Sequence, residues 1–286
     1  MSKIRLCIPK EPLSFPAVEE FDPSLEKWDD HAGNVYGFGL PRGTRYWMKF
    51  YHFGCFVAEP GYAEVLGSAN RGVDLGRFQE MFLRFVLPWV MQRQQWDCLH
   101  ASAVLTAAGV VAFCGPTGRG KSTLARACCE RGALPYSDDA VPFLIRDGVV
   151  LSARIPQPLR PREPAASRFA AVPKPEPNGG SELVWDLEPS LRPLSAVYWL
   201  EPAPDGHRPA LAVIERLPAA EGFRSMLSEA HCMTLRDAAC NRKMIRNYLS
   251  LAQLTPVFRL SFASDLDLIP QVLDCLEENQ QRLSPA

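Results

Sequence analysis

The sequence has no cysteine pattern of the kind that builds a disulfide framework or holds a metal. Its nine cysteines are an odd set, with no C-x-x-C pair and no regular ligand spacing. Such spacings identify disulfide-rich and metal-binding domains, so neither class is indicated. We expect these cysteines to be reduced thiols that are partly buried.

The chain also lacks an excess of charge of either sign. Lysine and arginine total 31 and aspartate and glutamate total 32, which gives a formal net charge of −1. Proteins that bind nucleic acid or anionic membranes usually carry a basic surface. We therefore expect neither nucleic acid nor a membrane as a partner.

Long hydrophobic runs are missing as well. The best candidate, residues 81–91, is too short to span a bilayer and contains Arg84 and Pro88, so we interpret it as a core helix with a bend. The first residues, Met1 to Arg5, lead into polar sequence without the apolar core of a secretory signal, which favours a cytoplasmic location. No internal repeat is evident.

What is present is enough apolar sequence for one large domain or two modest ones, because 47% of the 286 residues are hydrophobic. We expect an α/β protein with a small β-rich N-terminal region over residues 1–95, ending in an amphipathic helix over about 77–95. Residues 96–286 would form a nucleotide-binding domain with a mixed sheet. Its proline-rich stretch, residues 155–193, predicts a long surface segment without regular structure.

Within the second region, apolar runs and turn signals predict several elements. Hairpins are expected over 101–114 and 141–153. Further strands are expected at 196–200, 211–215 and 257–262, with helices at 122–131, 219–230, 235–252 and 265–279.

The most specific motif is a phosphate-binding loop. The pattern G-x-x-x-x-G-K-[ST] is matched without a mismatch by Gly115, Pro116, Thr117, Gly118, Arg119, Gly120, Lys121 and Ser122. Glycines let successive N–H groups turn toward a phosphate, the lysine supplies positive charge, and the serine hydroxyl suits Mg²⁺. An apolar run precedes the loop and a helical pattern follows it, so the strand, loop and helix come in the required order. The motif predicts binding of ATP or a similar nucleotide.

Two further features lie close to this loop in the sequence. Asp138 and Asp139 follow the expected loop helix at the end of the next strand, where one acid can serve Mg²⁺ and the other can take a proton from an attacking hydroxyl. Adjacent carboxylates also raise each other's pKa, which suits a base. His100 opens the strand two before the loop, and its ring could reach the acids to orient one of them.

In order and spacing, these elements resemble the catalytic domain of HPr kinase/phosphorylase, a bacterial serine kinase whose fold is related to that of phosphoenolpyruvate carboxykinase. The resemblance covers about fifty contiguous residues. The matching segments are His100-Ala101-Ser102-Ala103-Val104, Gly115 to Thr123, Arg131-Gly132 and Ser137-Asp138-Asp139-Ala140-Val141.

The resemblance implies a role for each matching residue. Asp138 would be the general base with His100 as its partner, and Lys121 would hold the β and γ phosphates. Ser122 and Asp139 would serve magnesium, although the two acids could exchange roles. Because the family forms ring-like assemblies, the resemblance also makes a homo-oligomer possible.

The chain departs from the family in two places. The E-[IV]-R-G-L-G signature is absent, with the proline-rich stretch in its place, so the phosphorylase reaction is not implied. The N-terminal region does not match the family's own, and the chain looks more like the shortened relatives found beside peptide-modification genes, including lasso-peptide precursor kinases.

We therefore expect an ATP- and Mg²⁺-dependent kinase that phosphorylates a serine-type hydroxyl of a peptide, a small protein or a serine-like small molecule. Arginines in and beside the proline-rich stretch could bind an acidic group of the acceptor or of the transferred phosphate. They are Arg154, Arg160, Arg162 and Arg168. The alternatives are a nucleotide-binding sensor or scaffold without phosphotransfer and a phosphate-loop ATPase.

Overall fold

The computed structural model describes residues 3–18, 22–29, 33–160, 182–202, 212–231, 237–263 and 265–283. The chain divides into two compact units. The first comprises Met1–Gln95, Pro175–Pro189 and Cys232–Asp237, and the second comprises Trp96–Lys174, Ser190–His231 and Ala238–Ala286. Each unit has a mixed sheet and at least one helix, so the protein is of the mixed α/β class.

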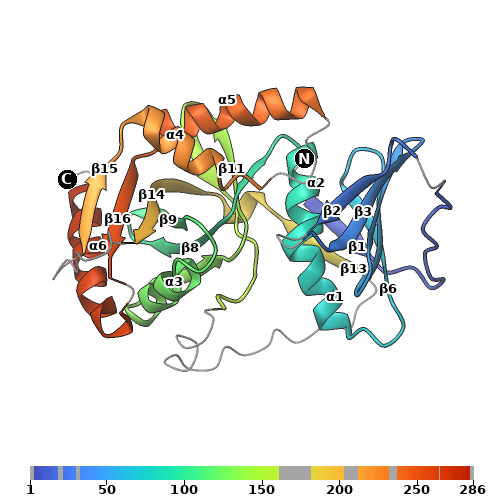
Figure 1. Cartoon of the computed structure of the whole chain (residues 1–286), viewed down its shortest axis with the longest axis horizontal. Helices are drawn as coiled ribbons and strands as arrows, with labels where there is room; N and C mark the ends of the chain where they lie inside the picture. Colours follow the sequence, from blue (N-terminus) through green and yellow to red (C-terminus); the bar gives the residue numbers. More distant parts are fainter. Residues whose placement is uncertain are drawn as a thin grey trace. The chain divides into compact units, whose positions relative to one another are not determined.

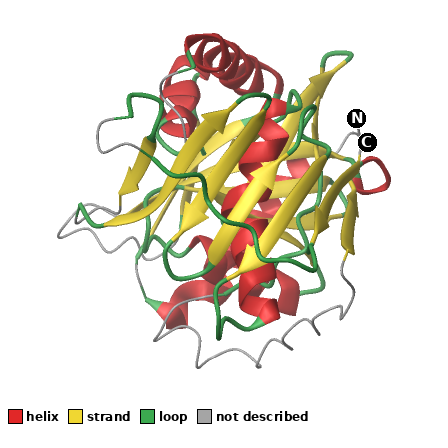
Figure 2. Cartoon of the chain, turned by 90° about the vertical axis from the view of Figure 1, so that its right-hand side faces the viewer, coloured by secondary structure: helices red, strands yellow, loops and turns green. Residues whose placement is uncertain are grey.

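The first unit is a seven-stranded sheet with the order β13-β1-β6-β5-β4-β3-β2. Its neighbours run antiparallel except β1 and β6, which are parallel. Figure 2 shows this sheet in front of the helical segment of the same unit. The strands are β1 (Lys3–Cys7), β2 (Glu26–Asp29), β3 (Val35–Arg42), β4 (Arg45–Phe50), β5 (Gly54–Ala58), β6 (Glu64–Ala69) and β13 (Glu182–Asp186).

β13 corrects the expectation that residues 155–193 lack regular structure. Five consecutive residues of β13 pair with β1, from Glu182 opposite Cys7 to Asp186 opposite Lys3. In the local sequence Glu182 to Asp186, three apolar residues stand between two acids, which suits a short strand, but the surrounding prolines concealed that signal. Residues 161–181 of the same stretch, with Arg162 and Arg168, lie outside the described residues.

The helical segment that ends the N-terminal region is interrupted as the sequence predicted. It consists of α1 (Leu75–Met81), a π-helical turn η1 (Phe82–Val86) and α2 (Leu87–Arg93). The Asp74 side chain caps α1 by accepting the N–H of Arg77. Pro88 cannot donate to the carbonyl of Arg84, and the helix widens just before it, where the N–H of Leu87 bonds the carbonyl of Phe82.

The second unit is built on a nine-stranded sheet in which β9, β14 and β16 run parallel. The other pairs are antiparallel, including the two predicted hairpins, β8 with β9 and β11 with β12. Because parallel strands end at the same edge, the carboxyl ends of β9, β14 and β16 share one edge of the sheet. The strands are β7 (Asp97–Leu99), β8 (Ala101–Thr106), β9 (Gly109–Cys114), β10 (Leu134–Ser137), β11 (Val141–Arg146), β12 (Val149–Ser152), β14 (Arg192–Pro202), β15 (Val213–Arg216) and β16 (Val257–Phe262).

Helices cover both faces of this sheet (Figure 1). On one face lie α3 (Lys121–Glu130) and α6 (Ile269–Leu283), and on the other lie α4 (Ala219–Leu227) and α5 (Ala238–Leu254). Single 3₁₀ turns occur at η3 (Glu188–Ser190) and η4 (Leu266–Leu268). Among the helices in the described part of the chain, none is long and apolar enough to cross a membrane.

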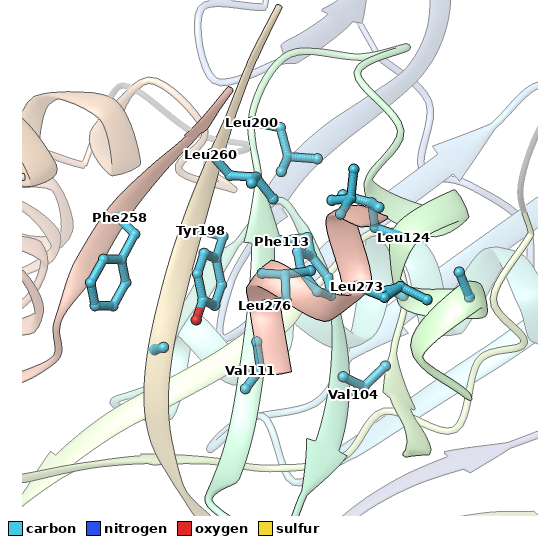
Figure 3. Packing of buried hydrophobic residues seen from close by; sticks show 14 of the residues in the cluster. Val104, Val111, Phe113, Leu124, Tyr198, Leu200, Phe258, Leu260, Leu273 and Leu276 are labelled. Atoms are coloured by element: carbon cyan, nitrogen blue, oxygen red, sulfur yellow. The ribbon is translucent and has the colours of Figure 1, made fainter. Parts of the chain in front are cut away.

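The core of the second unit anchors α3 to the sheet. Phe113, Tyr198 and Phe258 come from the three parallel strands, and their rings stack in succession at centroid separations of 6.0 and 5.3 Å. Leu124 from α3 and Leu276 from α6 pack on the same cluster, as Figure 3 shows. The start of α3 is therefore held at a fixed position beside the carboxyl end of β9.

Candidate functional site

The loop between β9 and α3 adopts a backbone that requires its glycines. Gly118 and Gly120 have φ of 87° and 89°, in the left-handed region that other residues enter at a cost. Gly115 approaches β14 so closely that an added Cβ would lie 2.9 Å from the carbonyl oxygen of Leu200. Among the described residues, no side chain caps the start of α3, which leaves its first N–H groups available to an anion.

Lys121 is folded back onto this loop. Its side chain is buried, with 8% of the residue exposed, and Nζ donates to the carbonyl oxygen of Gly115 at 2.5 Å. Burial lowers the pKa of Lys121, while nearby groups oppose that shift, first Glu229, then Cys114, Asp139 and Asp138. The ammonium therefore lies in the field of three carboxylates.

Asp138 is enclosed by hydrogen-bond donors. Its Oδ1 accepts the hydroxyls of Ser102 at 2.6 Å and Ser122 at 3.0 Å, and its Oδ2 accepts the backbone N–H of Arg160 at 3.0 Å. Only 1% of the residue is exposed. Burial, followed by the charge of Asp139, raises the pKa of Asp138, and the three donors act in the opposite direction.

Asp139 differs from its neighbour in both exposure and conformation. It is half-buried, and its φ of 61° places a non-glycine residue in the left-handed region. Such a conformation costs about 1 to 2 kcal/mol and persists only where the surroundings impose it. Backbone strain of this kind is concentrated at functional sites.

The predicted partnership of His100 with the two acids stays a prediction, because the structure brings its ring against another residue. The described contact of its ring is with Glu229, where Nδ1 lies 3.4 Å from Oε2. Glu229 belongs to a short segment after α4 rather than to the helix expected over 219–230, which ends at Leu227. Ala230 instead forms a bridge with Leu99 of β7.

His231 lies beside His100, near the same group of charged side chains. Burial lowers the pKa of His231 to about 4, the charge of His100 adds to the effect, and Asp139 opposes it. Its imidazole is therefore neutral at physiological pH.

The structure places the loop residues and both acids that the sequence singled out near one another, and it adds Ser102 and Glu229, to which sequence reasoning gave no role. Ser102 lies within the segment that resembles the kinase family, yet its side chain was given no role. Glu229 is separated from His100 by more than a hundred residues, and a single glutamate after a helix carries no pattern that would mark it.

The oxygen atoms near the loop suit Mg²⁺ in type but not in number. Within the described ranges, no group of three or more histidine, cysteine, aspartate or glutamate side chains could hold a metal. Ser122 and the two acids offer hydroxyl and carboxylate oxygens, and Mg²⁺ commonly binds one or two carboxylates together with substrate phosphates. The residues fit a magnesium ion that arrives with a nucleotide.

An open hollow of about 610 Å³ lies beside the loop, at the carboxyl edge of β14 and β16. Ligands of α/β sheets bind at such edges. The lining residues come from the loop and both strands. They are Pro116, Arg119, Trp199, Leu200, Glu201, Arg259 and Ser261.

The arginines near the proline-rich stretch can be placed only in part. Arg154 and Arg160 are both exposed, and the backbone of Arg160 touches Asp138. The backbone N–H of Arg154 bonds the Ser190 hydroxyl at 3.1 Å.

The chain matches no protein-family model and no curated protein. Its fold is similar to the solved structure of the Hpr(Ser) kinase/phosphatase from Coxiella burnetii, with a TM-score of 0.34 and 11% sequence identity. The alignment covers 65% of this chain and 97% of that one. A similarity this distant says nothing about the chemistry of the site.

Proposed function

We propose that the chain binds ATP with Mg²⁺ at residues 115–123 and transfers the γ-phosphate to a serine-type hydroxyl. The observation that carries this proposal is the contact between Ser122 Oγ and Asp138 Oδ1 at 3.0 Å. In phosphate-loop enzymes, a loop hydroxyl and an acid from another part of the sheet hold the same magnesium ion. The loop sequence and the acid pair at the end of β10 support the proposal independently.

Lys121 and the N–H groups at the start of α3 would hold the outer phosphates. To do so, the Lys121 ammonium must exchange the carbonyl oxygen of Gly115, to which it donates at 2.5 Å, for phosphate oxygens. Catalysis of phosphoryl transfer consists largely of such positioning and charge stabilisation. The hollow lined by Trp199 and Arg259 is large enough for the ribose and base.

The geometry supports an exchange of the roles that the family resemblance implied for the two acids. Asp138 accepts three hydrogen bonds, one of them from Ser122 of the loop, and this position beside the loop hydroxyl suits the magnesium ion. Asp139 is the more exposed acid and is held in a strained conformation, which suits the general base. We propose Asp139 as the base, with Asp138 in that role as the second assignment.

Two isosteric variants separate these assignments. If Asp139 is the base, Asp139→Asn abolishes transfer but leaves Mg²⁺-dependent ATP binding intact, whereas Asp138→Asn weakens that binding. The reverse pattern would restore Asp138 as the base. Both properties can be measured on one preparation by calorimetric titration and by transfer from γ-labelled ATP.

The acceptor class is tested by incubating the protein with γ-labelled ATP, Mg²⁺ and a size-fractionated lysate of the source cells. Lys121→Met serves as the inactive control, because it keeps the length of the buried side chain without its charge. Label in a peptide, protein or metabolite fraction, lost in the control, would support a kinase and identify its pool of substrates. Label released only as phosphate would favour an ATPase, and ATP bound without turnover would favour a sensor.

A further inference from the structure

The segment after α4 is tied to β7 by the hydrogen bonds of an antiparallel pair. The N–H of His100 donates to the carbonyl of Glu229 at 2.8 Å, and the N–H of His231 donates to the carbonyl of Cys98 at 2.9 Å. Leu99 and Ala230 face each other between these bonds. His100 and Glu229 are therefore cross-strand neighbours on one face, where side chains of facing residues interact.

The side chains make the contact that this pairing predicts. The Nδ1 atom of His100 lies 3.4 Å from Oε2 of Glu229, and the Glu229 side chain is the more enclosed, at 12% exposed against 35% for His100. The separation is slightly longer than an ordinary hydrogen bond and lies within the range of an ion pair. An enclosed carboxylate beside Nδ1 favours the proton on that nitrogen.

We infer that Glu229 is a positioning residue that fixes the His100 ring with its proton on Nδ1, leaving Nε2 as the proton acceptor in the neutral ring. The part of this inference that concerns catalysis rests on the proposed function. Glu229 also acts on Lys121, on which its charge has the largest electrostatic effect. One carboxylate thus connects the strand that carries His100 with the lysine of the loop.

The position of the proton on the neutral His100 ring can be measured without an assay of enzyme activity. In protein labelled with ¹⁵N in its histidine rings, long-range ¹H–¹⁵N spectra distinguish the two neutral tautomers, and His100→Gln identifies the resonances. We expect the Nδ1–H form in the wild-type protein and a shift toward Nε2–H in Glu229→Ala. Glu278→Ala, which removes an exposed glutamate from α6, should leave the spectrum unchanged.

Two outcomes would overturn the inference: an Nε2–H ring in the wild-type protein, or the same ring state in Glu229→Ala as in the wild type. The first needs only the His100→Gln assignment and no variant of Glu229, so the test survives if Glu229→Ala fails to fold.

Activity gives the second test. Glu229→Ala should slow phosphate transfer by up to about a hundredfold through misplacement of the ring. In a His100→Ala background, the same change should slow transfer much less than in the wild-type background, because only the effect of Glu229 on Lys121 remains. Additive losses would indicate a merely structural role. If ATP is not bound at all, the proposed function fails, whereas the spectra still decide the contact of Glu229 with His100.

Discussion

Removal of the Ser102 hydroxyl tests how the site holds a buried carboxylate. Ser102 is buried, donates to Oδ1 of Asp138 at 2.6 Å and lies 3.2 Å from the Ser122 hydroxyl. Of the three hydrogen bonds that lower the pKa of Asp138 against the effect of burial, that of Ser102 is the largest. Ser102→Ala should therefore raise the pKa of Asp138 further.

The loss of stability caused by Ser102→Ala depends on whether Asp138 is ionised. A hydrogen bond to an ionised group contributes about 1.5 to 3 kcal/mol, against about 0.5 to 1.5 kcal/mol for a neutral pair. Because the folded pKa is raised, the stability contributed by Asp138 is fully present below its unfolded pKa and is lost as the pH rises through the folded value. In Ser102→Ala this loss is larger. We expect the variant to lower the free energy of unfolding by about 2 kcal/mol at pH 8 and by about 1 kcal/mol at pH 4.

Calorimetry at both pH values measures this difference as a melting temperature. A cost of about 2 kcal/mol corresponds to a fall of about 4 to 8 °C for a domain of this size. Ser195→Ala is the matched control, because the Ser195 hydroxyl donates to the neutral carbonyl of Val110 at 3.1 Å and its loss should cost the same at both pH values. An equal cost of Ser102→Ala at pH 4 and pH 8 would refute the account of Asp138 as a charged group in the folded protein.

Three further outcomes follow from the described contacts. Asp139→Gly should raise the free energy of unfolding in urea by about 1 kcal/mol, because glycine adopts a left-handed φ without strain. The same change should abolish phosphate transfer. A variant less stable than the wild type would show that the strain is not local. Trp199→Ala should weaken ATP binding in calorimetric titration, whereas Trp47→Ala in the first unit should not. If both variants bind ATP with the same affinity, the hollow is not the site of the adenine ring. Leu276→Ala should lower the free energy of unfolding by about 2 to 5 kcal/mol, because Leu276 is buried. Leu134 is 61% exposed, so Leu134→Ala should lower it by less than about 0.5 kcal/mol. Similar melting temperatures of the two variants would contradict the packing of α6.

The parts of the site that the sequence predicted are those encoded by neighbouring residues. The loop is recognisable because each position from Gly115 to Ser122 has a local requirement, and the apolar runs around it form β9 and α3. The acids were expected at a strand end, and they directly follow β10, at Ser137. Their different environments could not be predicted, because the donors on Asp138 come from β8, α3 and a segment after β12.

The parts that sequence did not reveal depend on pairing between distant segments. Glu229 faces His100 only because the chain after α4 forms a bridge with β7, and no local pattern records that bridge. β13 likewise pairs with a distant segment, because its partner β1 lies near the N-terminus. Strand pairing over such distances is decided by packing rather than by the propensity of either segment.

The balance of charge in the site explains why a nucleotide should arrive with its metal. Glu229, Asp139 and Asp138 each act on the buried ammonium of Lys121 and oppose the lowering of its pKa by burial. They favour the charged form of the lysine, yet the same carboxylates would repel a free triphosphate. A nucleotide that carries Mg²⁺ has less net negative charge, and its metal can meet the oxygens of Ser122 and Asp138, which lie 3.0 Å apart. On the proposed function, the acids that favour the charged lysine would therefore also favour the metal-bound form of the nucleotide.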